Sequence, residues 1–379
     1  MKKHEHLTVK RLKDGLKTVR DPRRQWGNLR HQLVDIFVIA LFGIICGSES
    51  WDEVEAYGKT KKEWLKGFLV LENGIPSADT YERLFTEIAP SELERVYREW
   101  VSPYVGGCLK KQISFDGKTI RGASKIRGED AKLHIVSAWV REDGITIGQI
   151  KTDEKSNEII AIPELLRTLD ISGGTVTIDA MGCQTAIAES IVAKEANYVL
   201  AVKLNQPTLC EEVIDFFAWA TQDDIEKNKL NSFELTEKGH GRICTWNVTA
   251  TADVQWFESI DEWPLLRSMI MVNRKTTEGE IVSEETRYFI SSLIASAEHF
   301  HHLIRGHWSI ENQLHWVLDV TFHEDQSLIH KGHAPENLSI IRKIALALLK
   351  KDSSRKGSLK GKRKIAGWDD SFLASLLDS

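Results

Sequence analysis

The segment from residue 111 to residue 202 constrains the fold more than any other part of the chain. It begins with short β-branched runs separated by turns and continues as an alternation of apolar runs with amphipathic stretches. Glu142-Asp143-Gly144, between two of these runs, predicts a hairpin. The pattern predicts strands at 112–115, 133–140, 145–150, 175–178 and 198–202, and helices at 157–169 (kinked or restarted at Pro163) and 183–194. This order, β-β-β-α-β-α-β, predicts an α/β fold with a mixed sheet flanked by helices.

Helical patterns precede this segment, and a second strand-rich region follows it. Helices are predicted at 29–46, 51–68, 77–88 and 91–104, the last two with serine caps. We therefore expect a helical N-terminal domain at 1–108, which serves either DNA recognition or packing. An α/β domain is then expected at 109–350, with a β-rich insertion at about 207–285. Strands are predicted at 268–272 and 287–291, and the basic C-terminal tail at 351–379 is expected to end in a short helix at 368–377.

Charge is concentrated near the two ends of the chain, although the net charge is only −5. Residues 1–30 contain ten Lys and Arg against three Asp and Glu, and residues 342–364 contain ten against one. Basic segments of this kind neutralise phosphates and bind nucleic acid without sequence preference, or they only add solubility. The sequence leaves both interpretations open.

Composition argues against several classes of protein. The most apolar run, residues 36–47, is shorter than the ~20 residues that a membrane-spanning helix needs. No signal-peptide pattern follows the basic start. The five cysteines are far apart and form no C-x-x-C pair, so neither a disulfide framework nor a thiolate zinc site is predicted. We expect a cytoplasmic protein with no membrane partner.

Two aspartates stand at the ends of predicted strands, Asp116 after the first and Asp179 after the fourth. Each has an ordinary structural interpretation, because Asp-Gly is a common turn and aspartate often caps a helix. The topology favours a shared site, since the first and fourth strands can lie side by side and parallel, with both carboxylates at one edge of the sheet. Adjacent carboxylates repel unless a cation lies between them, and oxygen ligands of this kind suit Mg²⁺ or Mn²⁺.

The helical stretch 299–325 contributes a third acid, Glu311. At 100° per residue, His307 and His315 lie about 40° to either side of Glu311, so one face presents an acid between two imidazoles. Asp319 lies about 80° away and is a rival for the same role. The H-E-x-x-H spacing of a zinc site is absent from this stretch. Four residues are expected to anchor the stretch in the core: Ile304, Trp308, Leu314 and Leu318.

Taken in order, these motifs resemble those of the DDE transposases of insertion sequences, and most closely the H-repeat-associated, ISAs-type proteins. The resemblance covers nearly the whole chain and rests on many separate motifs in one order. They are Asp21-Pro22-Arg23, residues 51–55, Asn73-Gly74-Ile75-Pro76, Asp116-Gly117-Lys118-Thr119, residues 148–152, residues 178–184, His240-Gly241-Arg242 and residues 307–320.

The resemblance implies a ribonuclease-H-like catalytic core with a β-rich insertion before the glutamate helix. It also implies that Asp116, Asp179 and Glu311 form the DDE triad, as catalytic residues that bind two Mg²⁺ or Mn²⁺ ions. Related families place the glutamate in a Tyr-x2-Arg-x3-Glu-x6-Lys pattern, and this chain departs from it. Its residues at those offsets are Ile304, His307, Glu311 and Leu318, so the basic partners must differ.

Several polar residues near predicted strand ends, turns or the glutamate helix are candidates for contact with DNA. Each is also an ordinary surface residue by type. They are Lys118, Arg121, Lys203, Asn205, Gln206, Arg242, Arg305, His307 and His315.

The implied function is metal-dependent cleavage of double-stranded DNA at the ends of a mobile element, followed by strand transfer to target DNA. Partners would be the element's ends, target DNA and further copies of the chain, as a homodimer or larger oligomer on DNA, in a bacterial nucleoid. Two alternatives remain: a catalytically inactive or domesticated DNA-binding protein derived from a transposon, and a metal-dependent nuclease that cuts without joining.

Overall fold

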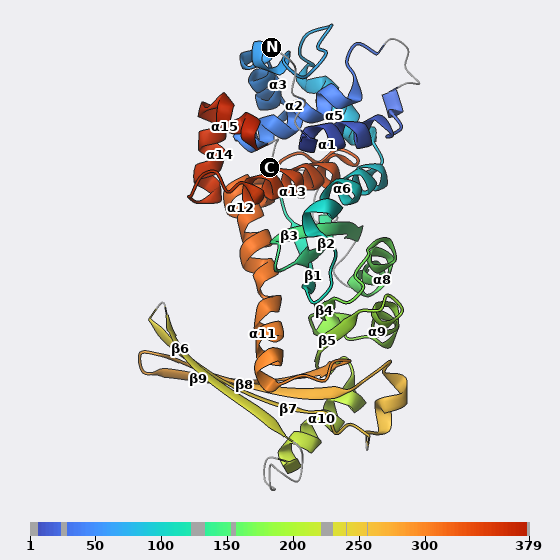
Figure 1. The fold of residues 1–379 in the computed structure, drawn as a ribbon, viewed down its shortest axis with the longest axis vertical. Helices are drawn as coiled ribbons and strands as arrows, with labels where there is room; N and C mark the ends of the chain where they lie inside the picture. Colours follow the sequence, from blue (N-terminus) through green and yellow to red (C-terminus); the bar gives the residue numbers. More distant parts are fainter. Residues whose placement is uncertain are drawn as a thin grey trace.

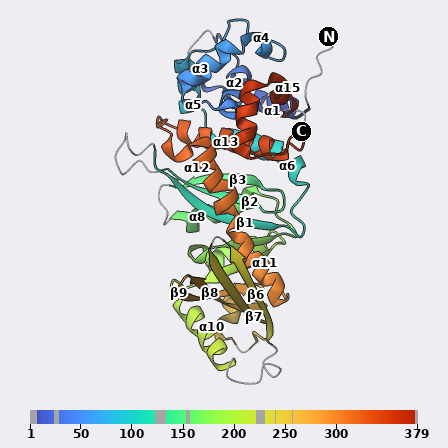
Figure 2. The same ribbon diagram turned by 90° about the vertical axis from the view of Figure 1, so that its left-hand side faces the viewer.

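A computed structural model describes residues 7–23, 29–122, 133–152, 157–220, 230–239, 241–255 and 257–376. His240, the first residue of one of the motifs above, lies outside these residues. The molecule is elongated, with a helical end, a central sheet and a group of long strands at the opposite end (Figure 1). A helical column runs along the sheet between the two ends, as Figure 2 also shows.

One sheet of nine strands runs through the described residues in the order β3-β2-β1-β4-β5-β9-β8-β7-β6. The pairs β1/β4 and β4/β5 are parallel, and the other pairs are antiparallel. The predicted mixed sheet is therefore confirmed. The strands are β1 (Gln112–Ile120), β2 (Leu133–Val140), β3 (Ile145–Thr152), β4 (Thr175–Ile178), β5 (Asn197–Val202), β6 (Asn231–Gly239), β7 (Arg242–Thr251), β8 (Ser268–Glu278) and β9 (Ile281–Ser291).

Helices cover both faces of the central strands, which is why β2 and β4 are buried along their whole length. On one side lie α8 (Glu158–Thr168) and α9 (Thr185–Val192). Helix α8 continues through Pro163, where we had expected a kink or a restart. On the other side, α11 (Ala297–His307), the π-helical turn η6 (Glu311–His315) and α12 (Trp316–Phe322) follow one another as the column in Figure 1.

The N-terminal region is helical, as predicted. Its most apolar helix, α2, is almost entirely buried and packs against α13 (Ala334–Lys351). Helix α6 begins at Pro90, so Ser91 lies inside its first turn instead of capping it. The helices are α1 (Leu7–Lys17), α2 (Leu33–Cys46), α3 (Trp51–Thr60), α4 (Lys62–Leu65), α5 (Ala78–Glu87) and α6 (Pro90–Val105).

A single buried core joins these helices to the sheet: Phe42 on α2, Trp139 on β2 and Ile341 on α13 belong to one hydrophobic cluster. The predicted N-terminal domain and the α/β domain share this core, so the domain boundary at residue 108 stays a prediction. In the described part of the chain, no one helix has the length and apolar character to cross a membrane. A bent pair formed by α2 and α3 does meet that test.

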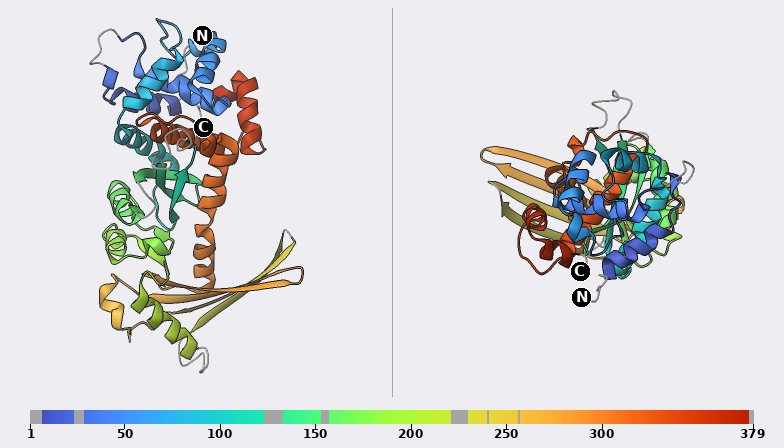
Figure 3. Two further views of the ribbon diagram at one scale, coloured as in Figure 1. Left: turned by 180° about the vertical axis from the view of Figure 1, so that it is seen from behind. Right: turned by 90° about the horizontal axis from the view of Figure 1, so that it is seen from above.

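The predicted insertion begins with α10 (Pro207–Ala220) and continues into strands longer than the pattern indicated. β8 and β9 pair along their whole length, from Ser268↔Ser291 to Glu278↔Ile281, whereas we expected only 268–272 and 287–291. We call β6–β9 the arm, because these strands extend sideways from the body of the molecule (Figure 3). β9 pairs with β5, so the arm continues the central sheet.

In the C-terminal region, residues expected to form a basic linker fold as α14 (Leu359–Trp368), and the short helix expected at 368–377 is confirmed as α15 (Asp370–Ser375). Two basic residues of this region, Lys362 and Arg363, are buried. The Arg363 guanidinium donates hydrogen bonds to the carbonyl oxygens of Ile44 and Thr321. These acceptors lie in the last turns of α2 and α12, where backbone carbonyls lack partners within their own helices.

Candidate active site

Asp116 lies inside β1, because its antiparallel pairing with β2 continues beyond it at Asp116↔Ser137 and as far as Ile120. The interpretation of Asp116-Gly117 as a turn is therefore wrong. Parallel pairing between β1 and β4 ends one residue earlier, at Phe115↔Ile178. Asp116 and Asp179 each follow that last pair, so the two strands deliver both carboxylates to the same edge.

Asp179 also keeps the role of a cap. Its Oδ1 accepts a hydrogen bond of 3.1 Å from the backbone N–H of Met181, in the short 3₁₀ turn η4 (Ala180–Gly182). The turn faces Asn205, whose side-chain amide donates to the Ala180 carbonyl at 2.8 Å. The interpretation of Asp179 as a cap is thus confirmed, and the same residue also lines the cavity described next.

A cavity of about 980 Å³ lies between the strand ends, the glutamate helix and the base of the arm. The three acids that line it come from distant segments: Asp116 from β1, Asp179 from the end of β4 and Glu311 from the helical column. Glu311 stands at the start of the π-helical turn η6, which is wider than an α-helical turn and is a common feature of functional sites. The polar residues that line the cavity include Asp116, Asp179, Lys203, Arg287, His307, Glu311, His315 and Asp319.

The three acids of this cavity that are proposed as metal ligands have no lysine or arginine counter-ion among the described residues. Burial, together with the charges of Asp179, Glu158 and Glu311, raises the pKa of Asp116 to about 7. Burial also raises the pKa of Glu311. A bound cation would relieve this repulsion.

The three carboxylates line one cavity without converging on one point. Among the described residues, no group of three or more His, Cys, Asp or Glu side chains is close enough together to hold a metal ion. The donor set itself fits Mg²⁺ or Mn²⁺, because hard oxygen ligands carrying uncompensated charge are what these ions bind.

The two histidines beside Glu311 are neutral. Burial lowers the pKa of His307 to about 4 and that of His315 to about 3. His307 Nδ1 shares a hydrogen bond of 3.1 Å with the Thr177 hydroxyl, and His315 Nδ1 lies 3.4 Å from Oδ2 of Asp116. Both rings therefore contact the strands of the site, and neither supplies a positive charge for a phosphate.

The rival acid, Asp319, differs from Glu311 in its partners. Lys118 donates hydrogen bonds to Asp319 and, at 2.7 Å, to Glu324. The Lys118 side chain is only 12% exposed, so it is held inside the protein and is not presented to DNA. Asp319 already has a lysine counter-ion, whereas Glu311 has no ion pair within the described residues, which makes Glu311 the better candidate ligand.

The other predicted DNA contacts lie in different places. Lys203 is exposed and lines the cavity. Asn205 and Gln206 donate to backbone carbonyls, of Ala180 and Cys183 respectively, and so support the loop after β4. Two exposed arginines form ion pairs, Arg305 with Glu237 and Arg242 with Glu278. Arg121 is also exposed, and its backbone N–H donates a hydrogen bond to the Asp325 carboxylate.

Sequence reasoning missed an aromatic wall. Trp308 was expected in the core, but it is 39% exposed and lines the cavity together with Trp316, which is 59% exposed. The Arg287 guanidinium lies 5.3 Å from the centre of the Trp308 ring. No local pattern in the sequence indicates this contact, because Arg287 lies on β9 and Trp308 at the end of α11. The other three predicted anchors, Ile304, Leu314 and Leu318, are buried.

Gly117 lets β1 approach a buried pair on the opposite face of the sheet. A Cβ atom at this position would overlap the side chains of Glu158 and His134. These two residues share a hydrogen bond of 2.7 Å and are almost fully buried. The glycine beside Asp116 is therefore required by packing.

Comparison with known proteins gives a consistent assignment. A family model described as "Transposase DDE domain" matches residues 108–348, and one described as "DDE_Tnp_1-associated" matches residues 13–101. The chain is 37% identical over 377 residues to "Putative transposase YncI" of Escherichia coli O157:H7, covering 98% of this chain and 96% of that one. It is 36% identical over 376 residues to "H repeat-associated putative transposase YhhI" of Escherichia coli K12, covering 98% of each chain.

Two further matches are more limited. "Inactive transposase YbfQ" of Escherichia coli K12 is 32% identical over 81 residues, which is 21% of this chain and 95% of that one. Among solved structures, a piggyBac transposase synaptic complex with hairpin DNA aligns with a TM-score of 0.43 and 10% identity, covering 97% of this chain and 77% of that one. The family match over residues 108–348 and the full-length relatives show that the chain belongs to the DDE transposase family of insertion sequences.

Proposed function

We propose that the chain is a transposase that cleaves DNA at the ends of its mobile element and joins the freed 3′-hydroxyl to target DNA. The observation that carries the proposal is that Asp116, Asp179 and Glu311, from three distant segments, line one cavity, where no lysine or arginine of the described residues pairs with them. Family membership supports the same chemistry.

We infer that these three carboxylates hold the metal, as two Mg²⁺ or Mn²⁺ ions. Bound there, the ions would supply Lewis acidity and an activated water for hydrolysis of a phosphodiester. The protein's own residues prepare the site. The Met181 N–H fixes Asp179, and His315 lies against Asp116 from the helix that carries Glu311.

Other side chains of the cavity suit a nucleic acid. Lys203 is placed to neutralise a phosphate, and the exposed rings of Trp308 and Trp316 offer flat surfaces to bases or sugars. We propose that the chain acts as a homodimer or larger oligomer on double-stranded DNA, because two element ends must be brought together before joining.

The test compares wild-type protein with Asp179→Ala on linear DNA carrying the element's ends, with Mg²⁺ or with EDTA. Wild type is expected to nick at the ends only with the metal, and Asp179→Ala is expected to lose more than ~1,000-fold of the cleavage rate. Asp215→Ala, a change of an exposed aspartate on α10, is the matched control and should cleave normally. Equal cleavage by wild type and Asp179→Ala would remove the proposed site.

The two alternative functions give different products. Tight binding to the ends without metal-dependent nicking indicates an inactive or domesticated DNA-binding protein. The short relative named as inactive makes this measurement necessary. Cleavage without strand-transfer products, in the presence of supercoiled target DNA, indicates a nuclease that does not join.

A further inference from the structure

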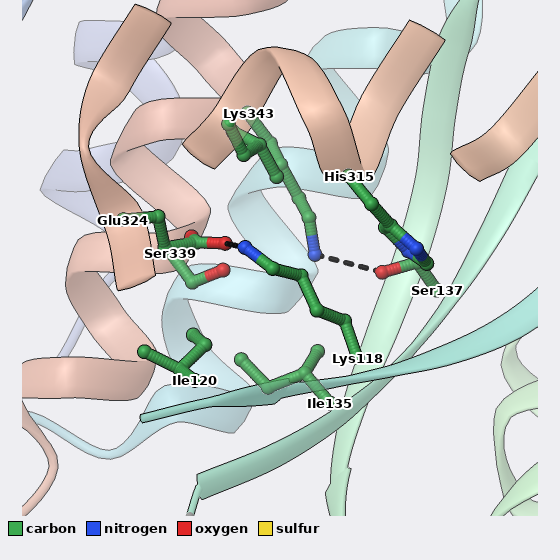
Figure 4. A pocket seen from close by; sticks show the side chains of 9 residues that line it. Lys118, Ile120, Ile135, Ser137, His315, Glu324, Ser339 and Lys343 are labelled. Atoms are coloured by element: carbon green, nitrogen blue, oxygen red, sulfur yellow. Dashed lines mark hydrogen bonds and ion pairs between the residues drawn. The ribbon is translucent and has the colours of Figure 1, made fainter. Parts of the chain in front are cut away.

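A buried group of charged side chains lies behind the candidate site (Figure 4). At its centre is Lys118, two residues after Asp116 on β1. Alternate residues of a strand project from the same face, so Lys118 and Asp116 point to the same side of the sheet. We call Lys118, Asp319 and Glu324 the lysine clamp.

The lysine clamp connects β1, the strand of Asp116, to the helical column that carries Glu311. The Lys118 ammonium donates to Asp319 on α12 and, at 2.7 Å, to Oε2 of Glu324 in the short 3₁₀ turn η7 (Glu324–Gln326). Helix α12 continues directly from the π-helical turn that begins at Glu311. One ammonium group on the strand of Asp116 therefore holds the helix of Glu311.

The charges in the clamp are retained although they are buried. Burial acts to raise the pKa of Glu324, but the charges of Lys118, Arg342 and Lys343 outweigh it and lower that pKa to about 2. Burial acts to lower the pKa of Lys118, but Glu324 and Asp319 raise it overall. The Glu324 side chain is 2% exposed. Removing Lys118 would leave the buried Glu324 carboxylate with only the Arg342 guanidinium, at 3.9 Å, and removing Glu324 would leave Lys118 with Asp319 alone.

The space around the clamp leaves little freedom. The cavity beside Lys118 has a volume of about 10 Å³, which is room for about one water molecule. His315, Ser137 and Lys343 line it, and Lys343 donates to the Ser137 hydroxyl at 2.9 Å. Nδ1 of His315 also lies beside Asp116. A shift of the helix against β1 would therefore disturb the clamp and the Asp116 contact together.

A buried ion pair adds little stability compared with an apolar pair of the same shape, so stability alone is a weak reason for this arrangement. Fixing the distance between two elements is a stronger one. Metal ligands must be held within ~0.5 Å of the productive geometry. Asp116 and Glu311 lie on elements that the clamp ties together.

We propose that Lys118 is a positioning residue, which through Asp319 and Glu324 holds the Glu311 helix against β1, so that Glu311 stays on the cavity of Asp116 and within reach of a shared metal. This inference rests on the proposed function, and on the metal that the three carboxylates would hold. Lys118 does not itself touch the DNA or the metal.

The test measures Mn²⁺ binding to the full-length, DNA-free protein from the electron paramagnetic resonance of the free ion. Lys118→Met and Asp319→Asn are expected to weaken Mn²⁺ binding by ~10–100-fold, and Lys118→Arg to recover most of it. Lys61→Met is the matched control, because Lys61 forms a part-buried ion pair of 2.6 Å with Asp370 at the helical end of the molecule. It should bind Mn²⁺ normally.

Cleavage and hydrogen exchange supply two further readouts. At saturating DNA, Lys118→Met is expected to lose ~100-fold of the single-turnover cleavage rate, while its affinity for DNA changes little. Amide hydrogens of residues 311–322 should exchange faster in Lys118→Met than in wild type or in Lys61→Met. A lysine with a purely structural role would lower the unfolding temperature without this local change or the loss of Mn²⁺ affinity.

The outcomes separate the inference from the function on which it rests. If Lys118→Met fails to fold, Asp319→Asn decides, because the Asp319 side chain is 36% exposed and its replacement leaves the Glu324 pair intact. If Asp179→Ala is inactive while Lys118→Met, or else Asp319→Asn, binds Mn²⁺ like wild type, the positioning role is wrong and the function stands. If Asp179→Ala cleaves like wild type, the proposed function fails.

Discussion

Nδ1 of His315 lies 3.4 Å from Oδ2 of Asp116, which joins the middle of β1 to the π-helical turn that begins at Glu311. Burial lowers the pKa of His315 to about 3, so the ring is neutral at physiological pH. Its Nε2 atom is buried without a hydrogen-bond partner in the part of the chain that the structure describes. Contact with the carboxylate is therefore the polar interaction that accounts for a histidine here.

Replacing this histidine should separate activity from stability. His315→Leu removes the nitrogen beside Asp116 and is expected to reduce metal-dependent cleavage by ~10–100-fold, the usual cost of losing a group that orients a ligand. Stability should hardly fall, because leucine also removes a buried nitrogen that has no partner. Single-turnover cleavage and urea unfolding measure the two effects. A large loss of stability with normal cleavage would contradict the assignment.

The aromatic wall predicts a contribution to DNA affinity. Trp316→Ala removes a ring that is 59% exposed in the cavity, and the affinity for element-end DNA is expected to fall ~5–100-fold, as for loss of one stacking surface. Trp368→Ala is the control, because Trp368 is 76% exposed but lies on α14, away from the cavity. Fluorescence anisotropy with labelled DNA measures both. Equal effects of the two changes would count against a specific role for the wall.

Glu324 predicts a component of acid denaturation. Its pKa is lowered from 4.5 to about 2 in the folded protein, so its stabilising contribution is complete above pH 4.5 and is lost as pH falls toward 2. That contribution is on the order of 3 kcal/mol. The difference in free energy of unfolding between wild type and Glu324→Gln should therefore shrink between pH 4.5 and pH 2.

Urea unfolding at several pH values measures this difference. Glu211→Gln, a change of an exposed glutamate, is the control and should follow wild type at each pH. A constant difference between wild type and Glu324→Gln across that pH range would show that the charge of Glu324 does not stabilise the fold.

The C-terminal helices predict a cost for losing one buried arginine. The Arg363 guanidinium donates to the carbonyl oxygens of Ile44, Ile45 and Thr321, and Arg363→Met would leave these acceptors without it. The free energy of unfolding is expected to fall by on the order of 3 kcal/mol. Lys364→Met, at the exposed neighbouring position, should change it by less than ~0.5 kcal/mol. Similar values for the two variants would assign Arg363 to the surface.

The central sheet was predictable because its strands are buried on both faces. β2 and β4 have the predicted bounds, and their apolar runs leave no other interpretation. The outer half of β9 could not be recognised in the same way, because residues 281–286 are exposed and carry no alternation of apolar and polar side chains. Pairing with β8, which a local pattern does not encode, extends this strand.

The site was predictable to the extent that it follows from topology. Adjacent parallel strands bring Asp116 and Asp179 to one edge whatever their side chains do. The surroundings of Glu311 were harder to predict, because helical angles assume a uniform 100° per residue and the π-helical turn breaks that rule between Glu311 and His315. The partner of Lys118 is 206 positions away, and no spacing in the sequence indicates it.

The pairing of β9 with β5 has a mechanical consequence for the arm. An insertion joined by two loops would behave as a tethered module, free to turn relative to the catalytic carboxylates. Here the hydrogen bonds of one sheet run from β1 to β6 without interruption, and α11 packs against β6, β7 and β8. The arm is therefore rigidly attached to the catalytic sheet, and a molecule bound along it keeps a fixed distance and orientation from Asp116.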